Sequence, residues 1–284
     1  MFSRRTKEII RKSSTFSPLN VVVIGGSRGI GLGFVKEYLS QGHQVFATYR
    51  NNGKGEELKS LQESHSHTLK LTELEITDYP AVELLKEKLD GPIDILILNA
   101  GVFLCPRGSQ PLTETVEEMR QTMEVNTYAP DQIMRTLFPK LLNPHSCAVY
   151  ISSTLSSYSD NLNGRFQSYR ASKAAGNILF QNWNIQLASK WLEKSDALDE
   201  RPCAFPISPG VVKTDMGSQS SPLTVSESVT AMIKVISEVR KHKQSSLYLY
   251  DGSILQQFPE PEIVKLKRNL LEQEAHKNSQ KLNC

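Results

Sequence analysis

Short apolar runs alternate with amphipathic stretches over most of the chain. The runs are rich in β-branched side chains, as strands are, whereas the stretches repeat their apolar residues with the period of a helix. The predicted strands are 20–24, 44–49, 68–74, 93–98, 148–151, 203–207 and 247–250. The predicted helices are 30–41, 80–89, 115–142, 167–191 and 225–239.

This order of elements predicts the class of fold. Strands that alternate with helices are joined by right-handed crossovers and form a parallel sheet with helices on both faces. The run at 93–98 is apolar throughout, as expected for a strand that is covered on both sides. No Pro-, Gly- or Ser-rich linker divides the chain, although polar connections are expected at 51–66 and 193–202. We therefore predict a single doubly wound α/β domain with a mostly parallel sheet of about seven strands.

The formal charge of +3 is unevenly distributed along the chain. Residues 1–19 carry five basic side chains and one acidic side chain, a net of +4, so the rest of the chain carries 3 − 4 = −1. A nucleic-acid surface needs basic residues on the folded part, and we expect no nucleic-acid partner. The pattern divides the chain into a basic N-terminal extension (1–19), a folded domain (20–258) and a charged C-terminal helix or tail (259–284).

Membrane, metal and disulfide functions find no support in the sequence. No run approaches the roughly 18 apolar residues of a membrane helix, and no secretory signal is present. His65 and His67 have no acid or thiol nearby at metal-ligand spacing, so we expect no metal site. The cysteines are too far apart for a zinc knuckle and suggest a reducing compartment: Cys105, Cys147, Cys203 and Cys284. We expect a cytoplasmic protein; the basic, hydroxyl-rich N-terminus leaves mitochondrial targeting as the alternative.

A glycine-rich turn follows the first predicted strand and leads into the first predicted helix. A pyrophosphate binds backbone N–H groups at a helix N-terminus, where side chains would block its approach, so glycines are needed there. A tight turn without a ligand would use the same residues, but the position within a βαβ unit favours dinucleotide binding. We therefore expect a Rossmann-type domain whose turn contacts the cofactor through Gly25, Ser27, Arg28, Gly29, Ile30 and Gly31.

The end of the second predicted strand indicates which dinucleotide is used. An acidic residue there binds the ribose of NAD, whereas a basic residue accommodates the 2′-phosphate of NADP. This chain has Arg50 at that position and Arg28 in the glycine turn, and two guanidinium groups can hold a phosphate in bidentate fashion. Solvated surface arginines are the alternative interpretation. The prediction is NADP(H).

Tyr169 and Lys173 are four residues apart in the predicted helix 167–191, so their side chains lie on one face. This spacing also arises by chance, and its context decides its meaning. The strand before the helix ends in Ser152 and Ser153, at the sheet edge where ligands bind in such folds. Hydride transfer to a carbonyl develops negative charge on oxygen, which requires a hydrogen-bond donor and a proton source. A serine hydroxyl and a phenol beside an ammonium, which lowers the pKa of the phenol, meet both needs.

Taken in order, these motifs resemble the short-chain dehydrogenase/reductase family from about Asn20 to Gly252. The resemblance rests on the glycine turn, the string Leu98-Asn99-Ala100-Gly101, Asn126, Ser153, Tyr169 with Lys173, and Pro209-Gly210. Within the family the chain is most similar to sniffer-type carbonyl reductases and C-factor proteins. The features that carry this likeness are the 16-residue interval from Ser153 to Tyr169, Tyr169-Arg170-Ala171-Ser172-Lys173, Val211-Val212-Lys213-Thr214-Asp215-Met216-Gly217 and Tyr250-Asp251-Gly252.

The resemblance implies a role for each matching residue. Tyr169 would be the general acid or base and Ser153 the hydrogen-bond donor, with the interval favouring Ser153 over Ser152. Lys173 would also bind the nicotinamide ribose, and Asn126 would hold a water that links Lys173 to solvent. Further cofactor contacts would come from Asn99, Ala100, Gly101, Pro209, Gly210, Val212 and Thr214. Glu75 departs from the family pattern, because an aspartate near the adenine is usual there.

These residues predict an NADP(H)-dependent oxidoreductase that acts on a small carbonyl or alcohol substrate. The alternative is a signalling or redox-sensing protein of the C-factor type that binds cofactor with little or no turnover. Helix 167–191 carries two apolar stripes, one through Ile178 and one through Phe180 and Leu187. One stripe covers the sheet and the other is free for a second subunit, so we expect a homodimer or homotetramer. A monomer covered by residues 262–284 is the alternative.

Overall fold

The computed structural model describes residues 17–50, 55–104, 113–217 and 219–282. The N-terminal extension up to residue 16, the terminal Cys284 and Cys105 lie outside the described residues. Leu19 is already part of the fold, because its carbonyl accepts a hydrogen bond from the Gln44 N–H and its side chain packs against the core.

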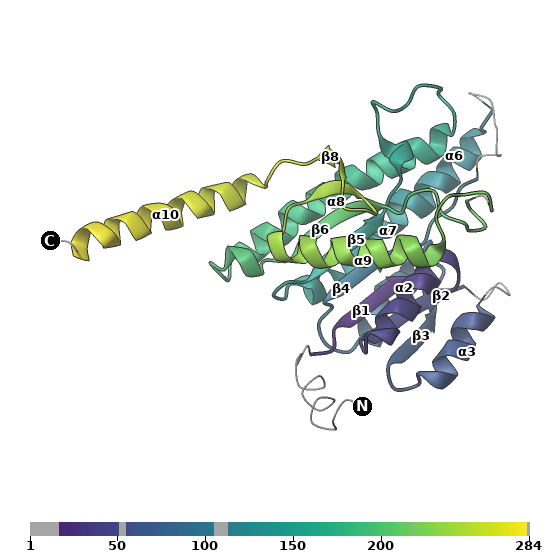
Figure 1. The fold of residues 1–284 in the computed structure, drawn as a ribbon, viewed down its shortest axis with the longest axis horizontal. Coiled ribbons are helices and arrows are strands. Elements are labelled where there is room, and N and C mark those ends of the chain that lie inside the picture. Colours follow the sequence, from purple (N-terminus) through teal and green to yellow (C-terminus); the bar gives the residue numbers. More distant parts are fainter. Residues whose placement is uncertain (1–16, 51–54, 105–112, 218, 283–284) are drawn as a thin grey trace, which may run out of the picture.

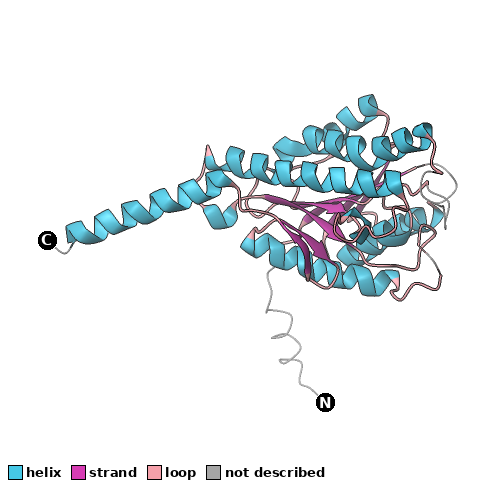
Figure 2. Ribbon diagram, turned by 90° about the horizontal axis from the view of Figure 1, so that it is seen from above, coloured by secondary structure: helices cyan, strands magenta, loops and turns pink. Residues whose placement is uncertain are grey.

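The centre of the molecule is an eight-stranded sheet with the order β3-β2-β1-β4-β5-β6-β7-β8 (Figures 1 and 2). All neighbouring strands are parallel except the last pair, in which β8 runs antiparallel to β7. The strands are β1 (Asn20–Ile24), β2 (Gln44–Tyr49), β3 (Leu69–Glu73), β4 (Ile95–Leu98), β5 (Cys147–Ile151), β6 (Cys203–Ser208), β7 (Ser246–Leu249) and β8 (Ile254–Gln257). The predicted doubly wound α/β fold is thus confirmed.

Helices cover both faces of this sheet (Figure 2). The α-helices are α2 (Gly29–Ser40), α3 (Glu56–Ser64), α4 (Tyr79–Glu83), α5 (Leu85–Lys88), α6 (Val116–Met123), α7 (Ala129–Leu137), α8 (Gln167–Leu192), α9 (Val225–His242) and α10 (Glu262–Leu282). Short turns of other helix types are η1 (Glu124–Tyr128, a π-helix), η2 (Phe138–Leu141), η3 (Thr154–Ser156) and η4 (Leu198–Glu200). In the described part of the chain, no helix is long and apolar enough to cross a membrane.

Two apolar cores lie on the two faces because successive strand residues point to opposite sides. Alternate residues of the central strands, such as Val23 and Val149, pack with α2, α3 and α9. Their neighbours, such as Val22 and Ala148, pack with α4, α5, α7 and α8. The sheet order reverses direction between β1 and β4, so their connections leave on opposite faces and open a crevice at the carboxyl ends of the strands.

The structure differs from the expected elements in four places. The polar connection at 51–66 contains helix α3, which has only Leu58 buried, and β8 adds a short, largely exposed edge strand after the last expected one. The predicted helix 80–89 is divided at Leu84 into α4 and α5. The predicted helix 115–142 is interrupted by the π-helical turn η1 before α7. Pro130 lies at the start of α7 and has no N–H to donate to the carbonyl four residues earlier, which explains why regular helix pairing changes there.

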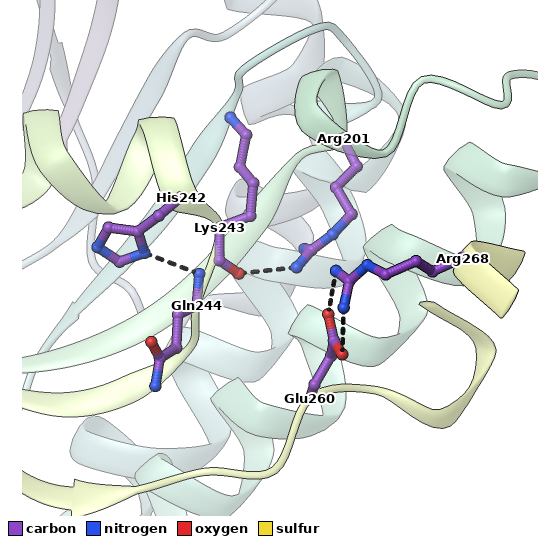
Figure 3. A network of polar contacts seen from close by, with 6 residues as sticks. All are labelled: Arg201, His242, Lys243, Gln244, Glu260 and Arg268. Atoms are coloured by element: carbon purple, nitrogen blue, oxygen red, sulfur yellow. Dashed lines mark hydrogen bonds and ion pairs between the residues drawn. The ribbon is translucent and has the colours of Figure 1, made fainter. Parts of the chain in front are cut away.

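Helix α10 begins on the body and projects away from it (Figures 1 and 2). Its first turns are fixed by the fully buried Val264 and by an ion pair from Lys267 to Asp196 at 2.5 Å. Arg268 donates two hydrogen bonds to the Glu260 carboxylate, at 2.7 and 3.1 Å (Figure 3). Beside this pair, the buried Arg201 donates to the Lys243 carbonyl at 2.8 Å. These contacts fix the base of the helix at the amino end of the sheet.

Candidate active site

A cavity of about 370 Å³ lies at the carboxyl ends of the central strands. Its lining combines the glycine turn, the turn after β4, two residues of α8 and the segment that follows β6. The predicted site residues that line it are Gly25, Ser27, Arg28, Gly29, Ile30, Arg50, Asn99, Ala100, Gly101, Tyr169, Lys173, Pro209 and Thr214. Gly31, Asn126, Ser153, Gly210 and Val212 do not line it. Most of the residues chosen from the sequence therefore meet at one crevice.

The glycine turn is held against β2 and the turn after β4. The N–H of Gly25 donates to the Thr48 hydroxyl at 2.9 Å, and the Asn99 amide donates to the Gly25 carbonyl at 2.8 Å. A Cβ at Gly31 would overlap that same carbonyl, and Gly25 adopts a φ of +86°. Both positions thus require glycine, one because of the close approach and one because of its backbone conformation.

Helix α2 begins at this turn with its N-terminus available to a ligand. Arg28 is the N-cap and makes no side-chain capping hydrogen bond, so no capping side chain binds the first N–H groups of the helix. Its guanidinium instead forms an ion pair with Asp215 from the segment after β6. The positive end of the helix dipole faces the cavity, which favours an anionic group there.

Arg50 lies at the rim of the cavity, where its guanidinium pairs with Glu75 at 3.3 Å. Glu75 also accepts a hydrogen bond from the Thr77 hydroxyl at 3.2 Å. Both Arg50 and Arg28 are about half exposed, at 50% and 45% of the side chain. Exposed ion pairs contribute only about 0–1 kcal/mol, so either arginine can exchange its carboxylate for a phosphate at small cost.

Asn126 lies in the π-helical turn η1 and joins three elements. Its side chain donates to the Val102 carbonyl at 2.9 Å, accepts from the Val102 N–H at 2.8 Å and donates to the Ser172 hydroxyl at 3.1 Å. It is completely buried. The amide therefore fixes the turn after β4 against α8. The family resemblance implies that Asn126 holds a water, which stays a prediction. In the structure the same side chain positions Val102.

Tyr169 and Lys173 project from α8 into the same cavity and are 8% and 4% exposed. The Lys173 ammonium lies 5.7 Å from the centre of the Tyr169 ring and donates to the Ile151 carbonyl at 2.8 Å. Burial lowers the pKa of Lys173 to about 7. Phe103 packs edge-on against Tyr169, with ring centres 4.8 Å apart, and fixes the orientation of the phenol.

The two serines after β5 have different environments. The Ser152 hydroxyl donates to the Asn177 side chain at 2.6 Å and is 2% exposed. Ser153 is half-buried, and its hydroxyl accepts from the Leu155 N–H at 3.1 Å. Among the described residues, the Ser153 hydroxyl donates its hydrogen to no other residue, whereas the Ser152 hydroxyl donates its hydrogen within the protein. Ser152 lines the cavity, whereas Ser153, the serine favoured by the sequence, is not among the lining residues.

The segment after β6 folds back over the glycine turn. Gly210 has a φ of +77°, and a Cβ there would lie 2.7 Å from Leu223, so the turn after Pro209 requires glycine. Val212 is buried and pairs with Leu223. Thr214 accepts a hydrogen bond from the Gly217 N–H at 2.9 Å and lies beside Gly29. This arrangement brings Thr214 to the cavity and keeps Val212 in a supporting position.

Three contributors to the site were not identified from the sequence. Thr48 holds the glycine turn from β2, Asp215 pairs with Arg28, and Tyr150 lies beneath Lys173 with its ring centre 4.7 Å from the ammonium. Each contact joins residues that are far apart along the chain. The one local signal was a polar residue inside an otherwise apolar strand, which Thr48 and Tyr150 both provide.

Fold, glycine turn and the Tyr169–Lys173 pair together define a dinucleotide-binding oxidoreductase site. A sequence model of the short chain dehydrogenases matches residues 19–223, which is more than half of the chain. The chain therefore belongs to the short-chain dehydrogenase/reductase family of oxidoreductases, as the ordered motifs predicted.

Individual relatives agree with this membership. An uncharacterized oxidoreductase of Schizosaccharomyces pombe is 30% identical over 256 residues, which are 82% of this chain and 96% of the relative. C-signal of Myxococcus xanthus is 29% identical over 169 residues, 57% of this chain and 92% of that protein. The carbonyl reductase Sniffer of D. melanogaster has a TM-score of 0.74 at 26% identity, covering 84% of this chain and 99% of Sniffer. A carbonyl reductase from Pseudomonas aeruginosa in complex with NADP has a TM-score of 0.70 at 28% identity, covering 84% and 100%.

Proposed function

We propose that this protein is an NADP(H)-dependent carbonyl reductase or alcohol dehydrogenase. The observation that carries the proposal is one cavity that holds both the uncapped N-terminus of α2 and the Tyr169–Lys173 pair. The first feature suits a pyrophosphate and the second suits proton transfer to a carbonyl oxygen. The likeness to two carbonyl reductases supports this class of substrate.

The chain's own residues supply acid–base chemistry and charge stabilisation. When bound, NADPH supplies the hydride. Tyr169 donates its phenolic proton to the carbonyl oxygen as negative charge develops there, and Ser153 donates a hydrogen bond to the same oxygen. The Lys173 ammonium lowers the pKa of the phenol through its positive charge and binds the ribose hydroxyls with its remaining donors. In the alcohol-oxidising direction the deprotonated Tyr169 accepts the proton of the alcohol, while Ser153 and Lys173 keep their roles.

The residues around the cavity fit NADP(H). Glycines leave room for backbone contact at the turn, and α2 presents an uncapped N-terminus to a pyrophosphate. Arg50 and Arg28 lie at the rim and are half exposed, so each can turn to a 2′-phosphate. The remaining contacts come from Asn99 to Gly101 and from Pro209 to Thr214.

The catalytic role of Tyr169 is tested with Tyr169→Phe, which keeps the ring and its packing on Phe103 but removes the proton. We expect NADPH oxidation with a panel of aldehydes, ketones and quinones to fall by at least about 10²-fold, the lower range for loss of a general acid. NADPH binding, measured by calorimetry, should change little. Retained turnover in the variant would contradict the assignment.

The choice of cofactor is tested with Arg50→Ala. Loss of a charge-assisted contact to the 2′-phosphate should weaken NADPH binding by roughly 10-fold, or about 1.5 kcal/mol, with NADH binding unchanged. Glu75→Gln is the matched control, because it removes the competing carboxylate from Arg50 and should leave NADPH binding equal or tighter. Equal NADPH affinity in Arg50→Ala and wild type would contradict the NADP assignment.

A cofactor-binding signalling role is the second candidate, favoured by the similarity to C-signal. It predicts NADPH binding without turnover on any panel substrate and a biological activity that Tyr169→Phe leaves intact. The presence of Asn126, Ser153, Tyr169 and Lys173 in one chain supports the enzyme.

We further propose that the protein acts on small molecules as a homodimer or homotetramer. The stripe of α8 that contains Phe180 and Leu187 covers the sheet, whereas Ile178 on the other stripe is 65% exposed. Helix α10 projects away from the body (Figure 1), and Ile178 stays exposed with α10 in place.

A further inference from the structure

A glycine in the middle of α8 lies directly against Tyr150 of the neighbouring strand. Gly176 is buried, and a Cβ at this position would lie 2.5 Å from both the hydroxyl oxygen and one ring carbon of Tyr150. Glycine within a helix is unfavourable, and here the missing side chain makes the space that the tyrosine ring occupies. The close approach brings the phenol of Tyr150 under α8 at Gly176, which is three residues after Lys173.

Tyr150 contacts two residues of the proposed catalytic set at once. Its hydroxyl donates to the backbone carbonyl of Asn126 at 2.7 Å, and its ring centre lies 4.7 Å from the Lys173 ammonium. Phe180 stacks on the ring at 4.9 Å, which fixes its plane. Burial, followed by the nearby Tyr169, raises the pKa of Tyr150 well above its usual value, so the phenol stays neutral and keeps its hydrogen for the carbonyl.

The Asn126 carbonyl lacks its regular α-helical donor because of the residue four positions later. In an α-helix that carbonyl would accept from the N–H of residue 130, which here is a proline without one. The π-helical turn η1 and Pro130 together interrupt the regular i→i−4 hydrogen bonding of the backbone at this point. Tyr150, from a different element, provides a hydrogen bond to the carbonyl.

We propose that Tyr150 is a positioning residue, which holds the Lys173 ammonium over its ring face and the Asn126 carbonyl on its hydroxyl. The inference rests on the proposed reductase function, and it assigns to β5 a part in the reaction beyond its terminal serines. With the ring beneath it and the Ile151 carbonyl beside it, the ammonium directs its other donors toward the cavity.

Two kinds of contact are separated by two substitutions. Tyr150→Phe keeps the ring and removes the hydrogen bond to Asn126, whereas Tyr150→Leu also removes the aromatic face that stabilises the ammonium. Tyr248→Phe is the matched control: Tyr248 is also buried in the sheet, and its hydroxyl donates to a backbone carbonyl, that of Gln244, at 3.0 Å. Both phenylalanine variants thus lose one hydrogen bond from a phenol to a backbone carbonyl.

In Tyr150→Phe we expect kcat to fall about tenfold, with the KM for NADPH changed less than about twofold, because misplaced reacting groups cost rate more than binding. Tyr248→Phe should retain both constants within about twofold.

A second measurement needs no turnover: the Lys173 ammonium is titrated by NMR in the cofactor-free protein. In Tyr150→Leu its midpoint should move to lower pH by about one unit, because the cation–π contact favours the charged form. Tyr150 and Tyr169 are the titratable groups that face Lys173, and Tyr248→Phe should leave the midpoint unchanged.

Equal kcat in the two phenylalanine variants would overturn the role of the hydroxyl, and an unmoved Lys173 titration in Tyr150→Leu would overturn that of the ring. If Tyr150→Leu does not fold, the Lys173 titration is made on Tyr150→Met, which also removes the aromatic face, and Tyr150→Phe still decides the role of the hydroxyl. The parallel assay of Tyr169→Phe keeps the two hypotheses apart. A Tyr169→Phe enzyme that still turns over refutes the reductase mechanism, whereas an inactive Tyr169→Phe with a fully active Tyr150→Phe refutes only the positioning by the Tyr150 hydroxyl.

Discussion

Lys173 is 4% exposed, which is unusual for a lysine, and no carboxylate in the described part of the chain compensates its charge. The Ile151 carbonyl and the ring of Tyr150 are its neighbours of partial negative charge. Burial therefore dominates and lowers the pKa to about 7. Near neutral pH a small change in surroundings changes the charge of this side chain, which connects its packing to both stability and catalysis.

The burial of Lys173 predicts how stability depends on pH in the cofactor-free protein. Between pH 7 and about 10.4 the unfolded chain holds the lysine proton and the folded protein does not, so stability rises with pH across this window. Below pH 7 both states are charged and the full desolvation cost remains. We compare the free energies of unfolding of wild type and Lys173→Met in urea. Their difference, wild type minus variant, should rise by at most about 1.4 kcal/mol per pH unit in this window. A flat difference would show that Lys173 stays charged when folded.

Among the elements, helix α10 combines an anchored base with an outer part that projects from the body (Figure 1). Val264 is fully buried, and Lys267 and Arg268 make ion pairs with Asp196 and Glu260. Beyond this base, Leu270 is 54% exposed. The first two turns thus belong to the packed domain, although the charge pattern alone had placed the whole segment 259–284 outside it.

Two truncations test this division of α10. A chain that ends at Phe258 loses the buried Val264, and burial of one such side chain contributes about 1.5–3 kcal/mol, so we expect Tm to fall by roughly 4–8 °C. A chain that ends at Leu271 keeps the anchored turns and should melt within about 1 °C of the full protein. Calorimetry measures both. Equal melting of the two truncated chains would show that the base of α10 adds no stability.

The sequence predicted the longest helix and the buried apolar strands well and the exposed elements poorly. Strands β1, β2 and β5 lie within about a residue of the expected bounds because they are short runs that are buried almost throughout. Helix α8 also matches its expected bounds, although it buries polar residues such as Ser172 and Asn177 beside Phe180 and Leu187. Helix α3 contacts the core through only Leu58 and, three positions later, Leu61, and β8 is short and largely exposed at the sheet edge, so both give weaker signals than the buried runs. The break at η1 lies directly before α7, at whose start Pro130 stands.

At the scale of the whole molecule, the outward stripe of α8 is the apolar surface on which the oligomeric state depends. Ile178 is 65% exposed on a helix whose opposite face is buried, and Leu270 presents a second apolar side chain on the projecting α10. Single exposed apolar residues are common on monomers. In a dimer that pairs through α8 about a twofold axis, the interface would nevertheless bury Ile178 of both subunits.

Light scattering on two charged variants distinguishes these surfaces. If subunits pair through α8, Ile178→Glu should convert the assembly to monomers, because each interface then buries two uncompensated carboxylates. Leu270→Glu is the control, because it places the same charge on another exposed helical residue, and it should leave the mass of the assembly unchanged. The reverse result would place the interface on α10, and a monomeric wild type would support the single-chain alternative.

Much of the candidate site could be predicted from the sequence because its chemistry is local. The glycine turn is a continuous string, and Tyr169 and Lys173 are one helical turn apart, so spacing alone places their side chains together. The contacts of Arg28 with Asp215 and of Tyr150 with Asn126 span 187 and 24 residues. No periodic pattern encodes such pairs, which exist only once the sheet and its crossovers are assembled.

The sequence by itself determined the order of strands and helices, the parallel sheet and the family, since these follow from periodicity and from motifs read within short windows. The tertiary structure decided the electrostatics: the burial of Lys173, the ring of Tyr150 beneath it and the ion pairs of both arginines. The physical reason is that desolvation and charge pairing depend on which residues surround a group in space. Those neighbours come from distant parts of the chain and are fixed only by packing.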